Sequence, residues 1–517
     1  MTELGLIIGV FIQWSVHDTN RNCFRVIIMI FLKGLIHLWN YFSGVWLGPY
    51  VETSTGVLQG RIESFQDDQV YQFLGIPYAQ PPLDSLRFQR PVSKEPWYGV
   101  RDASRYGKAC LQRNEDMSPE DMDEDCLFLN VFVKKETFEN NKQQYQHRPV
   151  MIWIHGGGFM TGSGQGIFNG IPMVPMFDTI LVTINYRLGP FGYAWFGDAE
   201  PRIAGNMGQW DQIEAIRWVK KNIRAFGGNP DSITIFGQSA GSIAVSLHII
   251  SPVSSGLFTK AIMQSGSMLF PQDITNEVVE SQSCTMLSKT PCQGNTQILE
   301  CLQSLDASTI LNAASDKLMS FRPRYGEQSV PMSPQEAFAT GNRPNWPGSV
   351  LLGAEKEEFA LFLTKFNPTT FNPASPGPMD KESALQMMGM LFKPDKVPEM
   401  AEIYLNNGNI SSPQFLPKQM IKLFGDVALV CPTVMFGLNM IDCQNCQAKM
   451  YAYLHTQKPA SSTNKLCDSS PWYGACHSAD LPHVFGRPFT QPQLYSDIDR
   501  SMSFRMMHIW AHFAATG

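Results

Sequence analysis

The sequence predicts an α/β protein built around a large, mostly parallel sheet. Three short apolar runs, at 150–154, 179–184 and 232–236, are bounded by turn-forming residues, which is typical of strands buried on both faces. Helical patterns follow at 209–223 and from Ala240 onward. Strands that alternate with helices in this way favour a parallel sheet covered by helices.

Each expected element has a pattern of its own. Residues 51–60 alternate as a β-hairpin does. The runs at 150–154 and 179–184 read Val-Met-Ile-Trp-Ile and Thr-Ile-Leu-Val-Thr-Ile, which suits buried strands. Within 209–223, one helical stripe is apolar and consists of Ile213, Ile216 and Val219. The globular domain is expected to span residues 49–517.

The composition excludes several classes of protein. Of 517 residues, 44% are hydrophobic and 17% charged, which permits a large core and excludes wholesale disorder. A net charge of −6 leaves no basic footprint for nucleic acid. The mean hydropathy of −0.14 excludes a polytopic membrane protein. Cys443 and Cys446 form the single C-x-x-C pattern, and without a second pair no metal site is expected.

Residues 1–48 differ from the rest and are expected to form a leader or signal anchor. Arg21 and Arg25 precede the apolar run 26–32, as in a secretory signal, although an upstream extension of another kind is the alternative. Asn409-Ile-Ser411 is a glycosylation sequon, which makes Asn409 a candidate. These features predict a secreted or ER-lumenal protein, with membrane anchoring through the N-terminal segment as an option.

A candidate nucleophile follows the strand expected at 232–236. Gly237-Gln-Ser-Ala-Gly241 fits the pattern G-x-S-x-G, and a helical run comes after it. In that setting a tight turn lifts the serine hydroxyl above the carboxyl edge of the sheet, and glycine leaves room for the turn. Ser239 is therefore the candidate nucleophile. A glycine-rich turn with an ordinary serine is the alternative.

A glycine loop, His155-Gly-Gly-Gly158, follows the strand at 150–154. Such a loop can direct backbone N–H groups at a developing oxyanion, and side chains would obstruct that approach. The alternative is a flexible turn.

A serine nucleophile needs a base, and the base needs an orienting acid. Four histidines lie more than 200 residues after the serine motif: His455, His477, His483 and His508. His477 lies in a loop of small residues, which suits a mobile base, whereas His508 lies in an expected helix. The chemistry of the residues alone leaves the choice open.

Longer motifs surround these residues. The segment 226–241 matches a known serine signature throughout, and 124–131 matches a second signature of the same family. Further agreement comes from 185–189, 205–208, 211–212 and 263–266. On these motifs the chain resembles the type-B carboxylesterase/cholinesterase family of α/β-hydrolases, from about residue 49 to the end.

The resemblance implies an α/β-hydrolase fold and a catalytic triad. Ser239 corresponds to the nucleophile, Glu358 to the acid and His477 to the base, in the chain order of the family. Glu355 and Glu357 are close rivals for the acid role.

The resemblance also implies oxyanion donors and disulfides. Three backbone N–H groups correspond to the oxyanion donors, those of Gly157, Gly158 and Ala240. Four cysteines correspond to two disulfide loops: Cys110 with Cys126, and Cys284 with Cys301. Cys292 lies between the second pair and competes as a partner.

Three departures from the family pattern refine the expectation. Gln238 precedes the nucleophile where many members have Glu. The loop between Cys110 and Cys126 has no Trp, where cholinesterases carry a cation–π platform for choline, so a carboxylesterase is expected rather than a true acetylcholinesterase. Members usually continue for several tens of residues past the helix expected at 505–517, so the C-terminal end is expected to be incomplete.

The expected function is that of a serine carboxylesterase that acts on small-molecule esters without metal or cofactor and binds no nucleic acid. A non-catalytic adhesion or binding protein on the same fold, like the neuroligin-like relatives, is the rival interpretation. An inactive truncated fragment is a third. The oligomeric state stays open.

Overall fold

The computed structural model describes most of the chain after residue 47. The described residues are 48–114, 116–140, 148–269, 275–316, 319–341, 346, 348–406, 408–410, 412–442 and 448–517. The expected leader at 1–48 therefore lies almost entirely outside the described residues, and so do Cys443 and Cys446.

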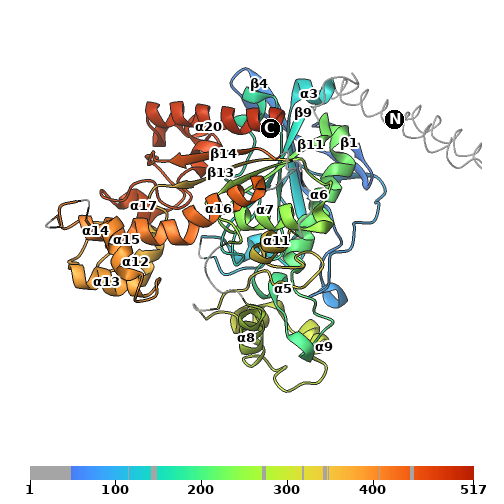
Figure 1. Ribbon diagram of the computed structural model, residues 1–517. Helices are drawn as coiled ribbons and strands as arrows, with labels where there is room; N and C mark the ends of the chain where they lie inside the picture. The colour runs from blue at the N-terminus through green and yellow to red at the C-terminus, as the bar shows by residue number, and fades with distance from the viewer. Residues whose placement is uncertain are drawn as a thin grey trace, which may run out of the picture. The chain divides into compact units, whose positions relative to one another are not determined.

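A mixed sheet of nine strands, counted over the described residues, forms the centre of the fold (Figure 1). In spatial order these strands are β14 (Met450–His455), β13 (Ser349–Glu355), β12 (Lys260–Gln264), β11 (Gly228–Gln238), β9 (Arg148–Ile154), β10 (Ile180–Ile184), β8 (Phe128–Lys134), β4 (Asp68–Pro77) and β3 (Arg61–Phe65). The strands from β14 to β10 are parallel, and β8, β4 and β3 continue the sheet antiparallel. This arrangement confirms the predicted α/β-hydrolase fold class.

The apolar runs form strands because both of their faces are buried. Val150, Ile152 and Ile154 of β9 belong to a core cluster that also contains residues of two helices, whereas Met151 and Trp153 belong to a second cluster on the opposite face. Successive side chains of a strand point to opposite faces, so one run of five apolar residues supplies two cores. The predicted strands at 150–154, 179–184 and 232–236 correspond to β9, β10 and β11.

Helices cover both faces of the sheet. Helices α6 (Met207–Asn222) and α7 (Ala240–Ile250) contribute to the first core, and α20 (Asp497–Thr516) contributes to the second (Figure 1). The first two match the helices expected at 209–223 and from Ala240. The hairpin expected at 51–60 is present as β1 (Tyr50–Thr53) paired with β2 (Gly56–Gln59), and β5 (Val100–Asp102) extends it.

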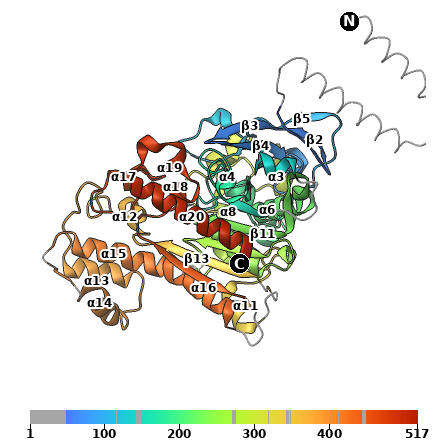
Figure 2. The same ribbon diagram turned by 90° about the horizontal axis from the view of Figure 1, so that it is seen from above.

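Further α-helices and strands complete the described part of the chain. They are β6 (Ala109–Cys110), β7 (Met122–Asp123), α3 (Lys135–Glu139), α4 (Met173–Phe177), α5 (Gly189–Tyr193), α8 (Asn276–Leu287), α9 (Ile298–Ser304), α10 (Ala307–Ala313), α11 (Pro334–Thr340), α12 (Ala360–Phe366), α13 (Lys381–Gly389), α14 (Val397–Leu405), α15 (Phe415–Gly425), α16 (Cys431–Ile441), α17 (Lys465–Ser469), α18 (Leu481–Val484) and α19 (Arg487–Thr490). Helices α13, α14 and α15 lie together at one side of the ribbon (Figure 2). Side chains from α12 to α15 pack with residues 467–476 into a third core cluster.

One helical stretch in the described part of the chain, Phe415–Ile441, is long and apolar enough to cross a membrane. It consists of α15, one π-helical turn (Asp426–Val430) and α16. Its apolar side chains Leu416, Met420 and Phe436 are buried in the protein. A core helix of a folded domain has the same composition.

Three disulfides join described cysteines. The Cys110–Cys126 bond that the resemblance implies is present. The expected Cys284–Cys301 pair is wrong: Cys301 of α9 bonds Cys292, and Cys284 is an exposed thiol on α8. Cys292 lies in the turn between α8 and α9, and only nine residues separate it from Cys301. Cys284 lies within α8, farther from Cys301 along the chain. The third bond joins Cys467 and Cys476.

Candidate active site

Ser239 lies alone between a strand and a helix. Strand β11 ends at Gln238 and α7 begins at Ala240, so the turn at Ser239 has no spare residue. Ser239 has φ 57° and ψ −125°, a backbone conformation that residues with side chains rarely adopt. Its N–H donates to the carbonyl oxygen of Gln264 at 2.9 Å, which ties the strained turn to β12. The tight turn predicted around Ser239 is therefore present.

The glycines of this turn are required by close backbone packing. A Cβ on Gly241 would lie 2.0 Å from the carbonyl oxygen of Ile154 at the end of β9, and one on Gly237 would lie 2.5 Å from the carbonyl carbon of Gly241. A Cβ on Gly156 would lie 2.6 Å from the carbonyl oxygen of Gln238. The glycine loop and the serine turn thus touch backbone to backbone, and any side chain would push them apart.

Two glycines of the loop have left-handed backbone conformations. Gly157 and Gly158 have φ values of +113° and +65°, which favour glycine. A Cβ on Gly158 would meet no atom within 4 Å, so this position faces open space. Toward the described residues, the N–H groups of Gly157, Gly158 and Ala240 form no hydrogen bond. Backbone N–H groups without a partner of this kind are the donors that an oxyanion hole requires.

His155, at the start of this loop, is a packing residue. Its ring stacks on Tyr186 with 4.3 Å between ring centroids, and it is buried. Burial lowers the pKa of His155 to about 4, so the imidazole is neutral at pH 7. His155 therefore supports the loop.

Glu358 and His477 form a close pair, and His477 contacts the residue before Ser239. The Nδ1 atom of His477 lies 2.6 Å from Oε2 of Glu358, and the second carboxylate oxygen of Glu358 accepts the N–H of Glu355 at 2.8 Å. On its other side, Nε2 of His477 lies 3.1 Å from the side-chain nitrogen of Gln238, the residue before Ser239. The imidazole thus bridges the Glu358 carboxylate and the serine turn. The three segments follow β11, β13 and β14, at the carboxyl ends of neighbouring parallel strands, where sites of this fold lie.

The two rival glutamates contact other groups. Glu357 accepts the N–H of Ala475 at 2.9 Å and packs against Gly474. Glu355 contacts His455, with 2.6 Å between Oε2 and Nδ1. Of the three glutamates considered from the sequence, Glu358 is the one that contacts His477.

The other candidate histidines lie elsewhere. His455 and His483 are buried and contact each other, with 3.1 Å between Nε2 and Nδ1. His508 lies on the exposed side of α20 near Phe177. None of the three is hydrogen-bonded to a residue of the serine turn.

Comparison with known proteins identifies the family. The family model described as "Carboxylesterase family" matches residues 48–517. The chain belongs to the carboxylesterase family. It is thus a carboxylic ester hydrolase by class, as the motifs predicted.

Curated relatives include both carboxylesterases and cholinesterases. An acylcarnitine hydrolase of Mus musculus is 34% identical over 496 residues, which cover 91% of this chain and 83% of the relative. An acetylcholinesterase of Leptinotarsa decemlineata is 31% identical over 512 residues, covering 90% and 78%. The pyrethroid hydrolase Ces2e of Rattus norvegicus is 32% identical over 490 residues, covering 91% and 82%.

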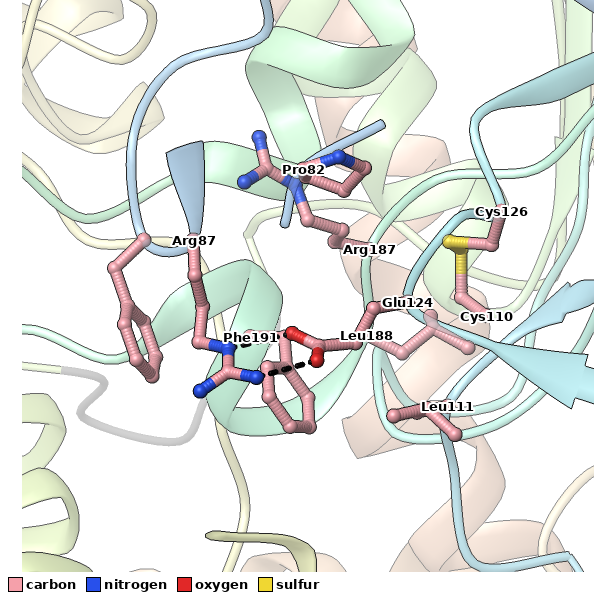
Figure 3. A pocket seen from close by; sticks show the side chains of 10 residues that line it. Pro82, Arg87, Cys110, Leu111, Glu124, Cys126, Arg187, Leu188 and Phe191 are labelled. Carbon is pink, nitrogen blue, oxygen red and sulfur yellow. Dashed lines mark hydrogen bonds and ion pairs between the residues drawn. A yellow bond between two sulfur atoms is a disulfide. The ribbon is translucent and has the colours of Figure 1, made fainter. Parts of the chain in front are cut away.

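In this carboxylesterase, residues of two sequence motifs help to line a small cavity, and Ser239 is not among the lining residues (Figure 3). Glu124, from the second signature, receives two hydrogen bonds from Arg87, at 2.7 and 2.6 Å. Arg187, from the motif at 185–189, forms a buried ion pair with Asp211 at 2.7 Å. The cavity is lined by Pro82, Arg87, Phe88, Cys110, Leu111, Glu124, Cys126, Arg187, Leu188 and Phe191. The Arg87–Glu124 and Arg187–Asp211 pairs occupy most of its polar groups, although Nη1 of Arg187 is buried and has no hydrogen-bond partner among the described residues.

Two features near the carboxylesterase site were missed from the sequence. The Cys467–Cys476 disulfide holds the loop that carries His477, and the adjacency of Cys476 and His477 was the available signal. The contact of Gln238 with His477 had no local signal, since 239 residues separate them. Across the described residues, no group of three or more His, Cys, Asp or Glu side chains is arranged to hold a metal ion.

Proposed function

We propose that this carboxylesterase hydrolyses carboxylic esters through an acyl-enzyme on Ser239, with His477 as base and Glu358 as orienting acid. The observation that carries the proposal is the 2.6 Å contact between Glu358 and His477, whose other ring nitrogen faces the serine turn. A nucleophile, a base and an orienter in this order make up the serine hydrolase arrangement.

The tautomer of His477 suits a base. Nε2 faces the side-chain nitrogen of Gln238, which carries hydrogens, so Nε2 acts as the acceptor there. The ring proton then lies on Nδ1 and is donated to Glu358. Nε2 therefore carries the lone pair that a proton from Ser239 requires, and the side chain of Gln238 must release that lone pair before the proton is transferred.

The reaction follows in two halves. His477 takes the hydroxyl proton of Ser239 while Oγ bonds to the ester carbonyl carbon, and the oxyanion accepts hydrogen bonds from Gly157, Gly158 and Ala240. The carbon–oxygen bond to the alcohol then breaks, and His477 protonates the leaving alkoxide. Water attacks the acyl-enzyme, gives its proton to His477 and releases the acid, after which Ser239 recovers its proton.

We also propose an oxidising compartment for the protein. Three disulfides among the described cysteines support this location, because disulfides persist in secreted and ER proteins. The basic and apolar leader expected at 1–48 would direct the chain there or anchor it to a membrane. Asn409 is exposed, which suits a glycan at its sequon.

Labelling with a fluorophosphonate probe tests the proposed nucleophile. The wild-type chain should be labelled and Ser239→Ala should not, with ester hydrolysis falling by several orders of magnitude. Ser242→Ala is the matched control, since Ser242 lies three residues on, is buried and donates to the carbonyl oxygen of Gly266. Labelling that persists in Ser239→Ala, or a folded wild-type chain that is never labelled, would overturn the proposal; the second result would favour a binding protein.

A further inference from the structure

A second row of titratable side chains lies directly behind the Glu358–His477 pair. Glu355 Oε2 lies 2.6 Å from His455 Nδ1, and His455 Nε2 lies 3.1 Å from His483 Nδ1. His483 Nε2 then lies 3.2 Å from Asp499 Oδ1. All four residues are buried. We refer to these four side chains as the Glu355–Asp499 row.

The row joins four elements of the fold. Glu355 ends β13, His455 ends β14, His483 lies in α18 and Asp499 lies in the first turn of α20. At the far end, Asp499 Oδ2 accepts hydrogen bonds from the hydroxyl and the N–H of Ser496, at 2.7 and 3.0 Å. That end of the row is therefore anchored to the start of a long helix.

The near end of the row contacts both sides of the proposed acid–base pair. The backbone N–H of Glu355 donates to Oε1 of Glu358 at 2.8 Å. The side chain of Glu355 accepts the N–H of Asp480 at 2.9 Å, three residues after His477 in the same loop. Glu355 thus links the segment that carries the acid to the loop that carries the base.

The three contacts within the row require three protons. A hydrogen bond needs one hydrogen, and there is one contact from Glu355 to His455, one between the imidazoles and one to Asp499. Two neutral imidazoles supply two hydrogens. With both carboxyl groups ionised, the two facing ring nitrogens would each present a lone pair to the other. The geometry therefore demands one further proton, on an imidazole or on a carboxyl group.

The surroundings favour Glu355 as the holder of the third proton. Glu355 faces the carboxyl groups of Glu358 and Asp480, and within the described part of the chain no lysine or arginine forms an ion pair with it. Burial and these carboxylates raise the pKa of Glu355 well above its ordinary value. Burial also raises the pKa of Asp480 to about 6.

The other three members of the row favour the forms that do not hold the third proton. Burial, and then the neighbouring His483, lower the pKa of His455 to about 3; burial also lowers that of His483. Although burial alone raises the pKa of Asp499, hydrogen bonds from Ser496 lower it overall. Tyr453 is the other titratable side chain near Glu355, and its hydroxyl stays protonated because burial raises its pKa.

We propose that the Glu355–Asp499 row is a positioning device in which neutral Glu355 donates a hydrogen bond to Nδ1 of His455 and holds the His477 loop in register with Glu358. The proposal rests on the proposed function, because it takes His477 as the base. Neutral Glu355 removes one of the negative charges that would otherwise lie close to Glu358. The imidazolium that forms on His477 during the reaction is then stabilised by Glu358.

A matched pair of substitutions tests this assignment. Glu355→Gln places an amide N–H where the protonated oxygen lies and keeps an oxygen for the N–H of Asp480, so it should retain kcat within a few-fold and the wild-type pH profile. Glu358→Gln should lower kcat by roughly 10³- to 10⁴-fold, as expected when the orienting acid becomes an amide. Glu355→Ala removes the link, and a loop displaced by about 1 Å should lower kcat by up to about 10²-fold with little change in KM.

The outcomes separate this proposal from the proposed function. A loss in Glu355→Gln as large as that in Glu358→Gln would show that Glu355 must be charged, and unchanged kcat in Glu355→Ala would show that it positions nothing; either result overturns the row alone. Full activity in both Ser239→Ala and Glu358→Gln overturns the triad and this proposal together. Thermal melts of each variant show whether a loss of activity reflects unfolding.

A spectroscopic measurement tests the proton count without any turnover. In the wild-type protein labelled with ¹⁵N-histidine, His455 and His483 should both give neutral Nε2–H signals at pH 7, assigned by their disappearance in His455→Phe and His483→Phe. An imidazolium signal from either residue would place the third proton on a ring and overturn the assignment to Glu355.

Discussion

His248 is expected to make the stability of this protein depend steeply on pH. The side chain is buried in the last turn of α7. Its Nε2 atom lies 2.9 Å from the side-chain oxygen of Gln212, and Nδ1 lies 2.9 Å from the hydroxyl of Ser254. The side-chain nitrogen of Gln209 lies 3.2 Å from both ring nitrogens. All of these partners are neutral, so none compensates a charge on the ring.

The size of the effect follows from the proton balance. Burial lowers the pKa of His248 to about 3, whereas an unfolded chain has a histidine pKa of about 6.5. Between these values the unfolded state binds a proton that the folded state does not, so the contribution is complete above about pH 6.5 and is lost as the pH falls toward 3. The slope approaches about 1.4 kcal/mol per pH unit, and the loss between pH 7 and pH 5 is about 2 kcal/mol.

Urea unfolding followed by tryptophan fluorescence at pH 7, 6 and 5 measures this term. His248→Gln keeps a donor and an acceptor at the site but cannot be protonated. Its free energy of unfolding should fall less between pH 7 and pH 5 than that of the wild type, by about 2 kcal/mol. The other buried histidines and carboxyl groups are common to both proteins, so their contributions cancel in the comparison.

Replacement of the exposed His512 by Gln is the control, because its side chain meets water in both the folded and the unfolded state. This variant should keep the wild-type pH dependence. If His248→Gln showed the same pH dependence of the free energy of unfolding as the wild type, His248 would have the same pKa in the folded and the unfolded state. The argument from burial would then be refuted.

Two further predictions concern the fold. Cys292→Ser should lower the free energy of unfolding by about 2–3 kcal/mol, because it removes a disulfide that closes a loop of this length. Cys284→Ser should leave the free energy of unfolding unchanged, since Cys284 is a free thiol. Equal effects of the two substitutions would contradict the Cys292–Cys301 pairing. Gly241→Ala should lower the free energy of unfolding by about 3 kcal/mol or more, because its Cβ would lie 2.0 Å from a carbonyl oxygen of β9. Gly389→Ala, in a helix with open space around it, should instead raise the free energy of unfolding by about 0.5–1 kcal/mol. Melting temperatures of the two variants that shift in the same direction would contradict this contrast.

The sheet and the serine turn could be predicted because their causes are local. A run such as Val150 to Ile154 is apolar throughout because it must supply two cores, and that need is visible in five residues. The glycines of the serine turn are required by contacts between neighbouring backbones, so they recur at fixed spacing around Ser239. In both cases the residues that the structure requires lie close together in the sequence, so a short pattern reveals them.

The second disulfide and the acid could not be chosen on local grounds. Cys284 and Cys292 are both candidates by composition, and the choice depends on the turn between two helices. Glu355, Glu357 and Glu358 lie within a span of four residues, yet each meets a different partner from the segment 455–480. Partners about 100 residues away or more are not encoded in the spacing, and the family resemblance was needed to select Glu358.

The histidines show why burial decides function more than residue type does. His477 and His455 each contact a glutamate at 2.6 Å, so a carboxylate–imidazole pair by itself does not mark a base. The His477 side chain is 10% exposed and faces the serine turn, whereas that of His455 is 3% exposed and faces another imidazole. A base must reach both a carboxyl group and the reacting hydroxyl, and of these two rings His477 is the one that faces the serine turn. The same pair of residue types therefore faces the serine turn in one place and a second imidazole in the other.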